Sequence, residues 1–265
     1  MNKTAIEWLD GGYTWNPVTG CLHGCEYCYA NGIAKRFGTL KKIEFDTLPD
    51  TIKEIDLGQK SIWEISKKLE GEIYPYDFTP TFHRYRLNKP QTVKKPKNVF
   101  VCSMADLFGN WIPDEWIQEV FKACEAATQH RYLFLTKNPN RYIELVGKGI
   151  LPDARNYWYG SSTVYADIPY FYSNNHNVFT SIEPIQSEFN RGFPIIESNW
   201  VIIGAETGNR KGKVIPKREW IENIVNACRD SKVPVFLKNN LASVWGEPLI
   251  QEFPWKESNY GKDCN

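Results

Sequence analysis

Short apolar runs alternate with amphipathic stretches over most of this chain, starting near Asn98. The runs are rich in Val, Ile and aromatic residues, as expected for strands that are buried on both faces. The expected strands cover 99–102, 132–135, 157–161, 178–182, 200–204 and 233–237. Apolar side chains at helical spacing predict helices between them, over 114–128, 140–146 and 217–229. Strands that alternate with helices imply right-handed crossovers and a parallel sheet, so the fold class is α/β.

An earlier unit precedes this series. Residues 13–18 predict a strand or an extended entry, and a helix over 30–37 is expected to end at Gly38. Six or seven such units favour a barrel or partial barrel over an open sheet, and no G-x-G-x-x-G follows the first strand, which weakens a dinucleotide-binding fold. Residues 39–97 are interpreted as an insertion after the first βα unit, with a capping box at 61–64 that opens a short helix through Leu69.

Length and composition narrow the class of protein. The chain has 265 residues, of which 42% are hydrophobic, enough for one large domain spanning 1–265 with a polar, irregular tail at 247–265. The net charge of +1 does not attract nucleic acid as a whole, so any such surface must be local. The first residues lack an apolar leader segment and no long uncharged apolar run follows. We therefore expect a cytoplasmic protein with no membrane span, in which thiols stay reduced.

Three of the seven cysteines lie in one short loop. Cys21, Cys25 and Cys28 have the spacing C-x3-C-x2-C, and Tyr27 directly precedes the third. Three thiolates on one loop can hold three irons of a [4Fe-4S] cube and leave the fourth iron without a protein ligand. The loop follows the first predicted strand, where the active sites of α/β barrels lie.

A structural zinc site is the alternative for this loop, with His23 as a fourth ligand. Zinc modules usually take paired ligands from two separated knuckles, and no second C-x2-C or H-x3-H pair occurs in the chain. The other cysteines have different settings. Cys124 and Cys228 fall on apolar helix stripes, Cys102 ends a buried strand, and Cys264 is expected to be a free thiol in the tail.

Polar residues follow the predicted strands wherever an apolar run stops. Because the carboxyl ends of parallel strands share one edge of the sheet, we expect these residues to surround one mouth. They include Ser103, Asp106, Lys137, Ser161, Ser162, Glu183, Glu206 and Lys238.

A local basic segment lies between Asp77 and Asp106, where the chain has no acidic residue. His83, Arg84 and Arg86 lie within it and alternate with aromatic residues, a pattern that suits phosphate contact combined with base stacking. The competing interpretation is a solvated loop whose charges balance acids elsewhere.

Several stretches together resemble the radical S-adenosylmethionine (SAM) superfamily, and within it a phage-associated three-cysteine-motif family similar to spore photoproduct lyase. The stretches that carry this resemblance are Ile6–Trp8, Thr14–Cys21, Gly24–Ala30, Phe82–His83 with Arg86–Leu87, Phe100–Phe108, Leu135–Lys137, Ser181–Pro184 and Val201–Gly208.

The resemblance implies a partial (β/α)6 barrel with a [4Fe-4S] cluster held by Cys21, Cys25 and Cys28. SAM would chelate the open iron, and reductive cleavage would give a 5′-deoxyadenosyl radical. An external electron donor of the flavodoxin or ferredoxin type is implied as a partner. The Gly-Gly-Glu run that binds the SAM amino group in many such enzymes is replaced here by Ser103–Asp106.

The resemblance also implies roles for individual side chains around SAM. Ser103 and Asp106 are the candidates for the amino group, and Tyr27 for adenine. Ser161, Ser162 and Glu183 are candidates for the ribose hydroxyls, Glu206 for SAM or substrate, and Lys137 for the SAM carboxylate or a substrate phosphate.

The leading hypothesis is a radical SAM enzyme that modifies or repairs a nucleic acid or nucleotide, with His83, Arg84 and Arg86 as substrate contacts. Two alternatives stay open. One is a radical SAM enzyme that acts on a peptide or small metabolite. The other is a non-catalytic iron–sulfur or zinc protein that binds nucleic acid.

Overall fold

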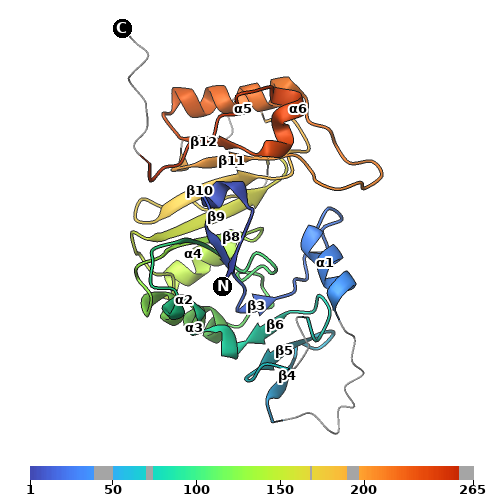
Figure 1. Cartoon of the computed structure of the whole chain (residues 1–265), viewed down its shortest axis with the longest axis vertical. Coiled ribbons are helices and arrows are strands. Elements are labelled where there is room, and N and C mark those ends of the chain that lie inside the picture. Colours follow the sequence, from blue (N-terminus) through green and yellow to red (C-terminus); the bar gives the residue numbers. More distant parts are fainter. Residues whose placement is uncertain (39–49, 70–73, 168, 190–196, 257–265) are drawn as a thin grey trace.

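The structure is a computed structural model that describes residues 1–38, 50–69, 74–167, 169–189 and 197–256. It contains a large sheet, a small sheet and flanking helices (Figure 1). The α/β class predicted from the sequence is confirmed.

Eight strands form the large sheet, and their order in space follows their order in the chain. They are β1 (Asn2–Lys3), β2 (Tyr13–Trp15), β7 (Asn98–Val101), β8 (Arg131–Thr136), β9 (Tyr157–Thr163), β10 (Asn177–Ile182), β11 (Val201–Ile203) and β12 (Val235–Leu237). β1 runs antiparallel to β2, and every other neighbouring pair is parallel. Over the described residues β1 and β12 are the edges of the sheet and do not pair with each other. All carboxyl ends of the parallel strands therefore lie along one edge.

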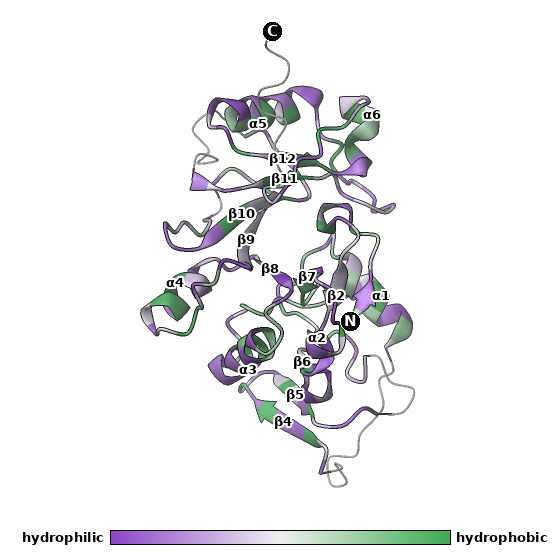
Figure 2. Cartoon of the chain, turned by 60° about the vertical axis from the view of Figure 1, so that its left-hand side comes forward, coloured by the Kyte–Doolittle hydropathy of each residue, from purple (hydrophilic) through white to green (hydrophobic). Residues whose placement is uncertain are grey.

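Three amphipathic helices cover one face of this sheet. They are α3 (Asp114–Glu125), α4 (Asn140–Gly147) and α5 (Arg218–Asp230), which confirms the helices predicted there to within a few residues at their ends. Apolar and polar residues lie side by side on these helices (Figure 2). Cys124 and Cys228 are buried with the apolar stripes, as predicted. Among the described residues, no helix combines the length and apolarity needed to cross a bilayer.

The opposite face of the sheet carries an aromatic cluster. Trp8 from the 3-10 helix η1 (Glu7–Leu9) packs on Phe100, Phe179 and Trp200, with ring centroids 4.9–6.3 Å apart. The tail adds Trp255, whose ring centroid lies 5.1 Å from that of Trp200. The described part of the tail, 247–256, forms no helix or strand, but it is not the polar segment that we expected, because its aromatic side chains close this face of the sheet. Cys264 lies outside the described residues.

The small sheet has the order β3 (Val18–Thr19), β6 (Thr81–His83), β5 (Ser61–Ile65) and β4 (Ile52–Asp56). The helix predicted from Ser61 is wrong, because Ile62, Trp63 and Ile65 are strand formers that pack into this layer. Trp63 stacks on Tyr76 with ring centroids 4.1 Å apart. The predicted extended entry over 13–18 is split between the two sheets. The insertion thus adds a second layer beside β2.

Shorter helices join these layers. α1 (Tyr29–Phe37) follows the cysteine loop and ends before Gly38, as predicted. The others are α2 (Lys89–Thr92), α6 (Ala242–Trp245), and the 3-10 helices η3 (Arg84–Arg86) and η5 (Asn239–Leu241).

Candidate functional site

A cavity of about 580 Å³ lies along the carboxyl edge of the large sheet, on the face that carries the aromatic cluster. This volume is within the range of ligand sites, roughly 300–1,000 Å³. The lining side chains that could bind or react are Cys21, His23, Cys25, Tyr27, Cys28, Tyr29, Ser103, Asp106, Lys137, Ser162, Ser181, Glu183, Glu206 and Lys238. The structure therefore brings the three cysteines and seven of the eight predicted cofactor-binding residues to one mouth.

The cysteine loop is held between the large sheet and the small sheet. The Gly20 N–H donates to the Met104 carbonyl at 2.9 Å, and the Cys21 N–H donates to the Phe78 carbonyl at 3.0 Å. Gly20 has a φ of +85°, and a Cβ there would lie 2.3 Å from the Thr79 carbonyl oxygen. Only glycine fits this close approach of two backbones. The glycine therefore fixes where the loop begins.

The second half of the loop turns directly into α1. The Cys28 N–H donates to the Cys25 carbonyl at 3.1 Å, and the Cys28 thiol caps the helix by accepting from the Asn31 N–H at 3.4 Å. All three cysteines are half-buried. Burial raises the pKa of the Cys21 thiol to about 12.

No three Cys, His, Asp or Glu side chains of the described residues converge as ligands of a single metal ion. A single ion requires such convergence, because zinc–sulfur bonds are only about 2.3 Å long. A cube does not require it, because each thiolate binds a different iron. The donor set of three thiols on one loop, all facing one cavity, is chemically suited to a [4Fe-4S] cluster.

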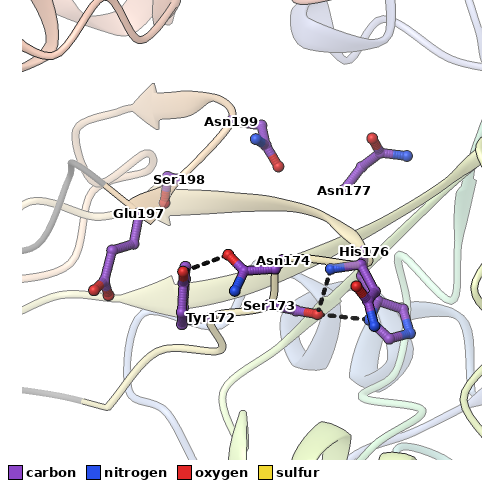
Figure 3. A pocket seen from close by; sticks show the side chains of 9 residues that line it. Tyr172, Ser173, Asn174, His176, Asn177, Glu197, Ser198 and Asn199 are labelled. Carbon is purple, nitrogen blue, oxygen red and sulfur yellow. Dashed lines mark hydrogen bonds between the residues drawn. The ribbon is translucent and has the colours of Figure 1, made fainter.

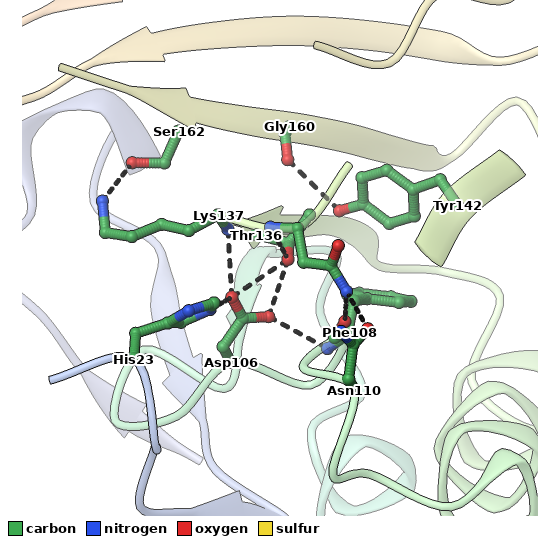
Figure 4. Close-up of polar contacts among 10 residues, drawn as sticks. His23, Asp106, Phe108, Asn110, Thr136, Lys137, Tyr142, Gly160 and Ser162 are labelled. Atoms are coloured by element: carbon green, nitrogen blue, oxygen red, sulfur yellow. Dashed lines mark hydrogen bonds and ion pairs between the residues drawn. The ribbon is translucent and has the colours of Figure 1, made fainter. Parts of the chain in front are cut away.

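Asp106 ties the cysteine loop to the ends of two strands (Figure 4). His23 Nε2 lies 2.7 Å from Asp106 Oδ2, and it must donate because a carboxylate only accepts. The same carboxylate accepts from the Thr136 hydroxyl at 2.8 and 3.0 Å, and from the N–H groups of Lys137 and Phe108 at 3.0 Å each. Asp106 is 5% exposed. Its oxygens are therefore occupied by the protein, and His23 is engaged as well.

Lys137 extends from the end of β8 across the mouth. Its Nζ donates to the Ser162 hydroxyl at 2.7 Å and lies 5.3 Å from the centroid of the Tyr27 ring. Desolvation raises the pKa of the Tyr27 phenol, so the ring stays neutral at physiological pH. Ser161 points to the other face of β9, where its hydroxyl accepts from the Phe171 N–H at 2.8 Å. Successive strand side chains alternate in direction, so only Ser162 lines the cavity.

Two carboxylates on the far wall are paired with cations, one from a distant segment of the chain and one from the same loop. Glu183 pairs with Lys238, which follows β12, and the absence of a side chain at Gly204 makes room for both. Glu206 is held at both oxygens by Arg210, at 2.7 and 2.8 Å. These hydrogen bonds lower the pKa of Glu206. Both carboxylates are therefore held in fixed positions at the mouth by their cationic partners.

Ser103 belongs to a small group of hydrogen-bonded residues at the cavity, between the end of β7 and the turn that follows β2. Its hydroxyl donates to Asn16 Oδ1 at 3.2 Å, and the same oxygen accepts from the Met104 N–H at 3.1 Å. The Tyr29 hydroxyl donates to the Ser103 carbonyl at 3.0 Å. Asn16 lies where the chain passes from β2 to β3, so this group aligns the two sheets at the cavity.

The three residues predicted to contact substrate do not line the cavity. His83 is fully buried, between the Thr19 hydroxyl at 2.9 Å and the Tyr85 hydroxyl at 3.2 Å. Arg84 pairs with Glu64 and Glu119. Arg86 donates to the Asn16 carbonyl at 2.9 Å. This segment joins the small sheet to the large one, and its arginines are engaged in contacts that hold the fold together.

Sequence reasoning missed the roles of four residues around the mouth: Asn16, His23, Lys238 and Arg210. The sequence indicates His23 only as a possible zinc ligand. Lys238 was recognised as a strand-end residue, but nothing in the sequence joined it to Glu183. The Glu206–Arg210 spacing of four residues was the one local signal available, although it falls in a loop rather than in a helix.

A second cavity, of about 530 Å³, lies at the opposite edge of the sheet (Figure 3). It is formed by loop residues around the starts of β10 and β11, and polar side chains dominate its wall. Asn199 Oδ1 accepts from the Val178 N–H at 2.9 Å, and Asn177 donates to two backbone carbonyls at 3.0 Å. These asparagines bind backbone groups at the starts of the strands, so they have a structural role at this edge of the sheet.

The fold and the mouth define an α/β protein whose candidate site combines three thiols with paired carboxylates at the carboxyl edge of a parallel sheet. By comparison with known families, the chain belongs to the family described as Protein of unknown function (DUF5131), which it matches over residues 3–254. No curated protein and no solved structure matches the chain.

Proposed function

We propose that this protein is a cytoplasmic radical SAM enzyme with a partial (β/α)6 barrel fold. The proposed cluster is [4Fe-4S], held by Cys21, Cys25 and Cys28. The observation that carries the proposal is that all three thiols face one cavity at the carboxyl edge of consecutive parallel strands. When bound, such a cluster supplies the electron that cleaves SAM to methionine and a 5′-deoxyadenosyl radical. The electron itself would come from an external flavodoxin or ferredoxin.

The side chains of the mouth can divide the binding of SAM among them. Lys137 offers an ammonium group to the SAM carboxylate, and Ser162 beside it offers a hydroxyl. Glu183 and Glu206 present acceptors to ribose hydroxyls or to substrate, and Tyr27 offers a ring face to adenine. Trp8 and Phe100 of the aromatic cluster line the cavity and would limit the access of water to a bound ligand.

Two of the residues predicted to contact SAM take modified roles in this proposal. Asp106 is assigned to positioning, because its oxygens are already bound by His23, Thr136 and two backbone N–H groups. Ser103 keeps a carbonyl and a hydroxyl at the mouth and remains a candidate for the amino group. Ser161 is no longer a candidate because its hydroxyl binds the Phe171 N–H on the other face of β9, and Ser162 remains as the candidate hydroxyl of this strand.

The substrate is proposed to be a nucleic acid or nucleotide that is modified or repaired. A peptide or small metabolite is the alternative within the same chemistry.

Anaerobic reconstitution tests the proposal. We expect about four irons per chain and formation of 5′-deoxyadenosine from SAM and dithionite. Ala substitution of Cys21, Cys25 or Cys28 is expected to abolish this cleavage, whereas Cys264→Ala, which removes a cysteine outside the loop, leaves it intact. Purified protein that contains zinc and does not cleave SAM would overturn the proposal in favour of a non-catalytic metal protein. Full cleavage by any one of the three loop variants would refute the ligand assignment.

A further inference from the structure

The helix that follows the cysteine loop exposes large apolar side chains. Tyr29, Ile33 and Phe37 of α1 are 54%, 38% and 56% exposed, whereas Ala30 and Ala34 face the protein and are 6% and 0% exposed. A surface helix normally turns its large apolar side chains inward and its small or polar ones outward. In α1 the large ones point outward, which is typical of a binding surface.

A cation shares this exposed side of α1. Because successive residues turn by about 100° around a helix, Tyr29, Ile33, Arg36 and Phe37 fall within a stripe about 100° wide. The Arg36 guanidinium lies 5.3 Å from the centroid of the Phe37 ring. From Tyr29 to Phe37 the helix rises by about 12 Å. We name these four residues the α1 stripe.

The α1 stripe continues into the candidate site. Tyr29 and Ile33 line the cavity together with the three cysteines, whereas Phe37 lies further along the helix, away from the loop. The Tyr29 hydroxyl is anchored on the Ser103 carbonyl, which fixes one end of the stripe at the mouth. A ligand that lies along the stripe would therefore place one of its units over the thiols.

We propose that the α1 stripe binds a single-stranded nucleic acid and directs one base of it into the cavity. Aromatic rings beside an arginine hold single strands by stacking with bases and by contact with phosphates. The chain has no acidic residue between Tyr27 and Gly38, so α1 itself does not repel phosphate. A folded, acidic protein could also meet a basic apolar helix. Continuity with the cavity favours the strand, because a single base can enter a cavity of this size and a folded protein cannot.

This inference rests on the proposed function only for what happens to the base, because strand binding itself does not require a cluster. It also moves the expected nucleic-acid contact from His83, Arg84 and Arg86, which are engaged within the fold, to α1.

Fluorescence anisotropy with a short labelled single strand of mixed sequence tests the inference, in parallel DNA and RNA arms. Phe37→Ala is expected to weaken binding roughly 5- to 150-fold, the usual effect of removing one stacking ring. Arg36→Ala should weaken binding and reduce the slope of log affinity against log salt by about 0.7, the value for one phosphate contact on a single strand. Tyr172→Ala and Arg155→Ala, which remove exposed side chains at the opposite edge of the sheet, should change neither quantity. Thermal melts of each variant show that the fold is retained.

Unchanged strand affinity in folded Phe37→Ala and Arg36→Ala would overturn the inference. It would also be overturned if these variants impaired only reduction by an acidic flavodoxin, because the stripe would then be the donor's surface. Failure of the proposed function looks different: SAM cleavage would be absent while strand binding still depended on α1. Conversely, SAM cleavage without stripe-dependent binding would leave the enzyme proposal standing and remove this one.

Discussion

Replacing Asp106 with Asn tests the assignment of this carboxylate as the tie between the cysteine loop and two strands. The variant keeps the shape of the side chain but exchanges one acceptor oxygen for an amide donor. If the amide takes the place of Oδ2, it faces the Lys137 N–H, which then has no acceptor. If it takes the place of Oδ1, the Phe108 N–H loses its acceptor instead. In either orientation one buried N–H is unsatisfied, and the remaining hydrogen bonds lose their charge.

The cost follows from these losses. An unsatisfied buried donor costs about 1–3 kcal/mol, and hydrogen bonds to a charged group are about twice as strong as neutral ones. We therefore expect Asp106→Asn to lower the free energy of unfolding by about 2–4 kcal/mol. At ~2.1 cal/mol/K of unfolding entropy per residue, a chain of 265 residues loses about 4–7 °C in Tm.

Thermal melts followed by circular dichroism measure this shift without any cofactor. Asp153→Asn serves as the matched control, because Asp153 is an exposed carboxylate in the loop before β9, at the opposite edge of the sheet. This variant should shift Tm by less than about 1 °C. A second measurement is SAM binding by the reconstituted protein. If Asp106→Asn left Tm unchanged and only removed SAM binding, our reasoning would be refuted, and Asp106 would be a ligand-contacting residue.

Three further predictions concern the frame around the site. Gly20→Ala should lower the free energy of unfolding by about 2 kcal/mol or more, because the new Cβ would overlap the Thr79 carbonyl. Gly24→Ala, where φ is also positive but the space is open, should lower it by about 1 kcal/mol. Equal losses of the two variants in urea unfolding would contradict the close approach at Gly20. Burial holds the pKa of His83 well below 6.5, so the unfolded chain takes up a proton that the folded protein does not. Stability should therefore decline as pH falls below about 6.5, and His83→Gln should flatten that part of the pH profile of Tm. The pKa of Glu64 is lowered because its hydrogen bonds with Arg84 and Trp116 outweigh its burial, so the ionised side chain stabilises the fold above about pH 4.5. In Glu64→Gln, the part of the stability that Glu64 loses as pH falls below that value should be absent. Urea unfolding that shows the same decrease of the free energy of unfolding at acid pH in both proteins would count against this prediction.

The strands and helices from Asn98 onward could be predicted because their signal is local. Apolar runs and helical stripes each lie within one segment, and the structure confirms them. Segment 61–65 could not be assigned in this way. Its Ser-x-x-Glu pattern also starts helices, and the deciding contact is the stacking of Trp63 on Tyr76, which lies outside the segment.

The site shows the same division between local and long-range information. The sequence indicated which residues end strands, but not which face each one takes. The sequence does not distinguish Ser161 from Ser162, because it predicts that the strand ends at 161. In the structure β9 continues to Thr163 and sends the two side chains to opposite faces. The partners of Arg84 are 20 and 35 residues away in the chain, so no pattern within the basic segment could reveal that its charges were already paired.

The charges around the mouth differ in how they are held, and this difference bears on what the cavity can accept. Asp106 and Glu183 are bound by His23 and Lys238, which come from distant segments of the chain, and Glu206 is bound by Arg210, four residues further along the same loop. These carboxylates hold their positions before a ligand binds, so their side chains need not reorganise on binding. Among the residues that the structure describes, Lys137 makes no ion pair, and its ammonium group uses one of three donors on Ser162. Its remaining donors lie beside the Tyr27 ring at the cysteine loop, so an anionic group of a bound ligand would find its counter-charge here, next to the three thiols.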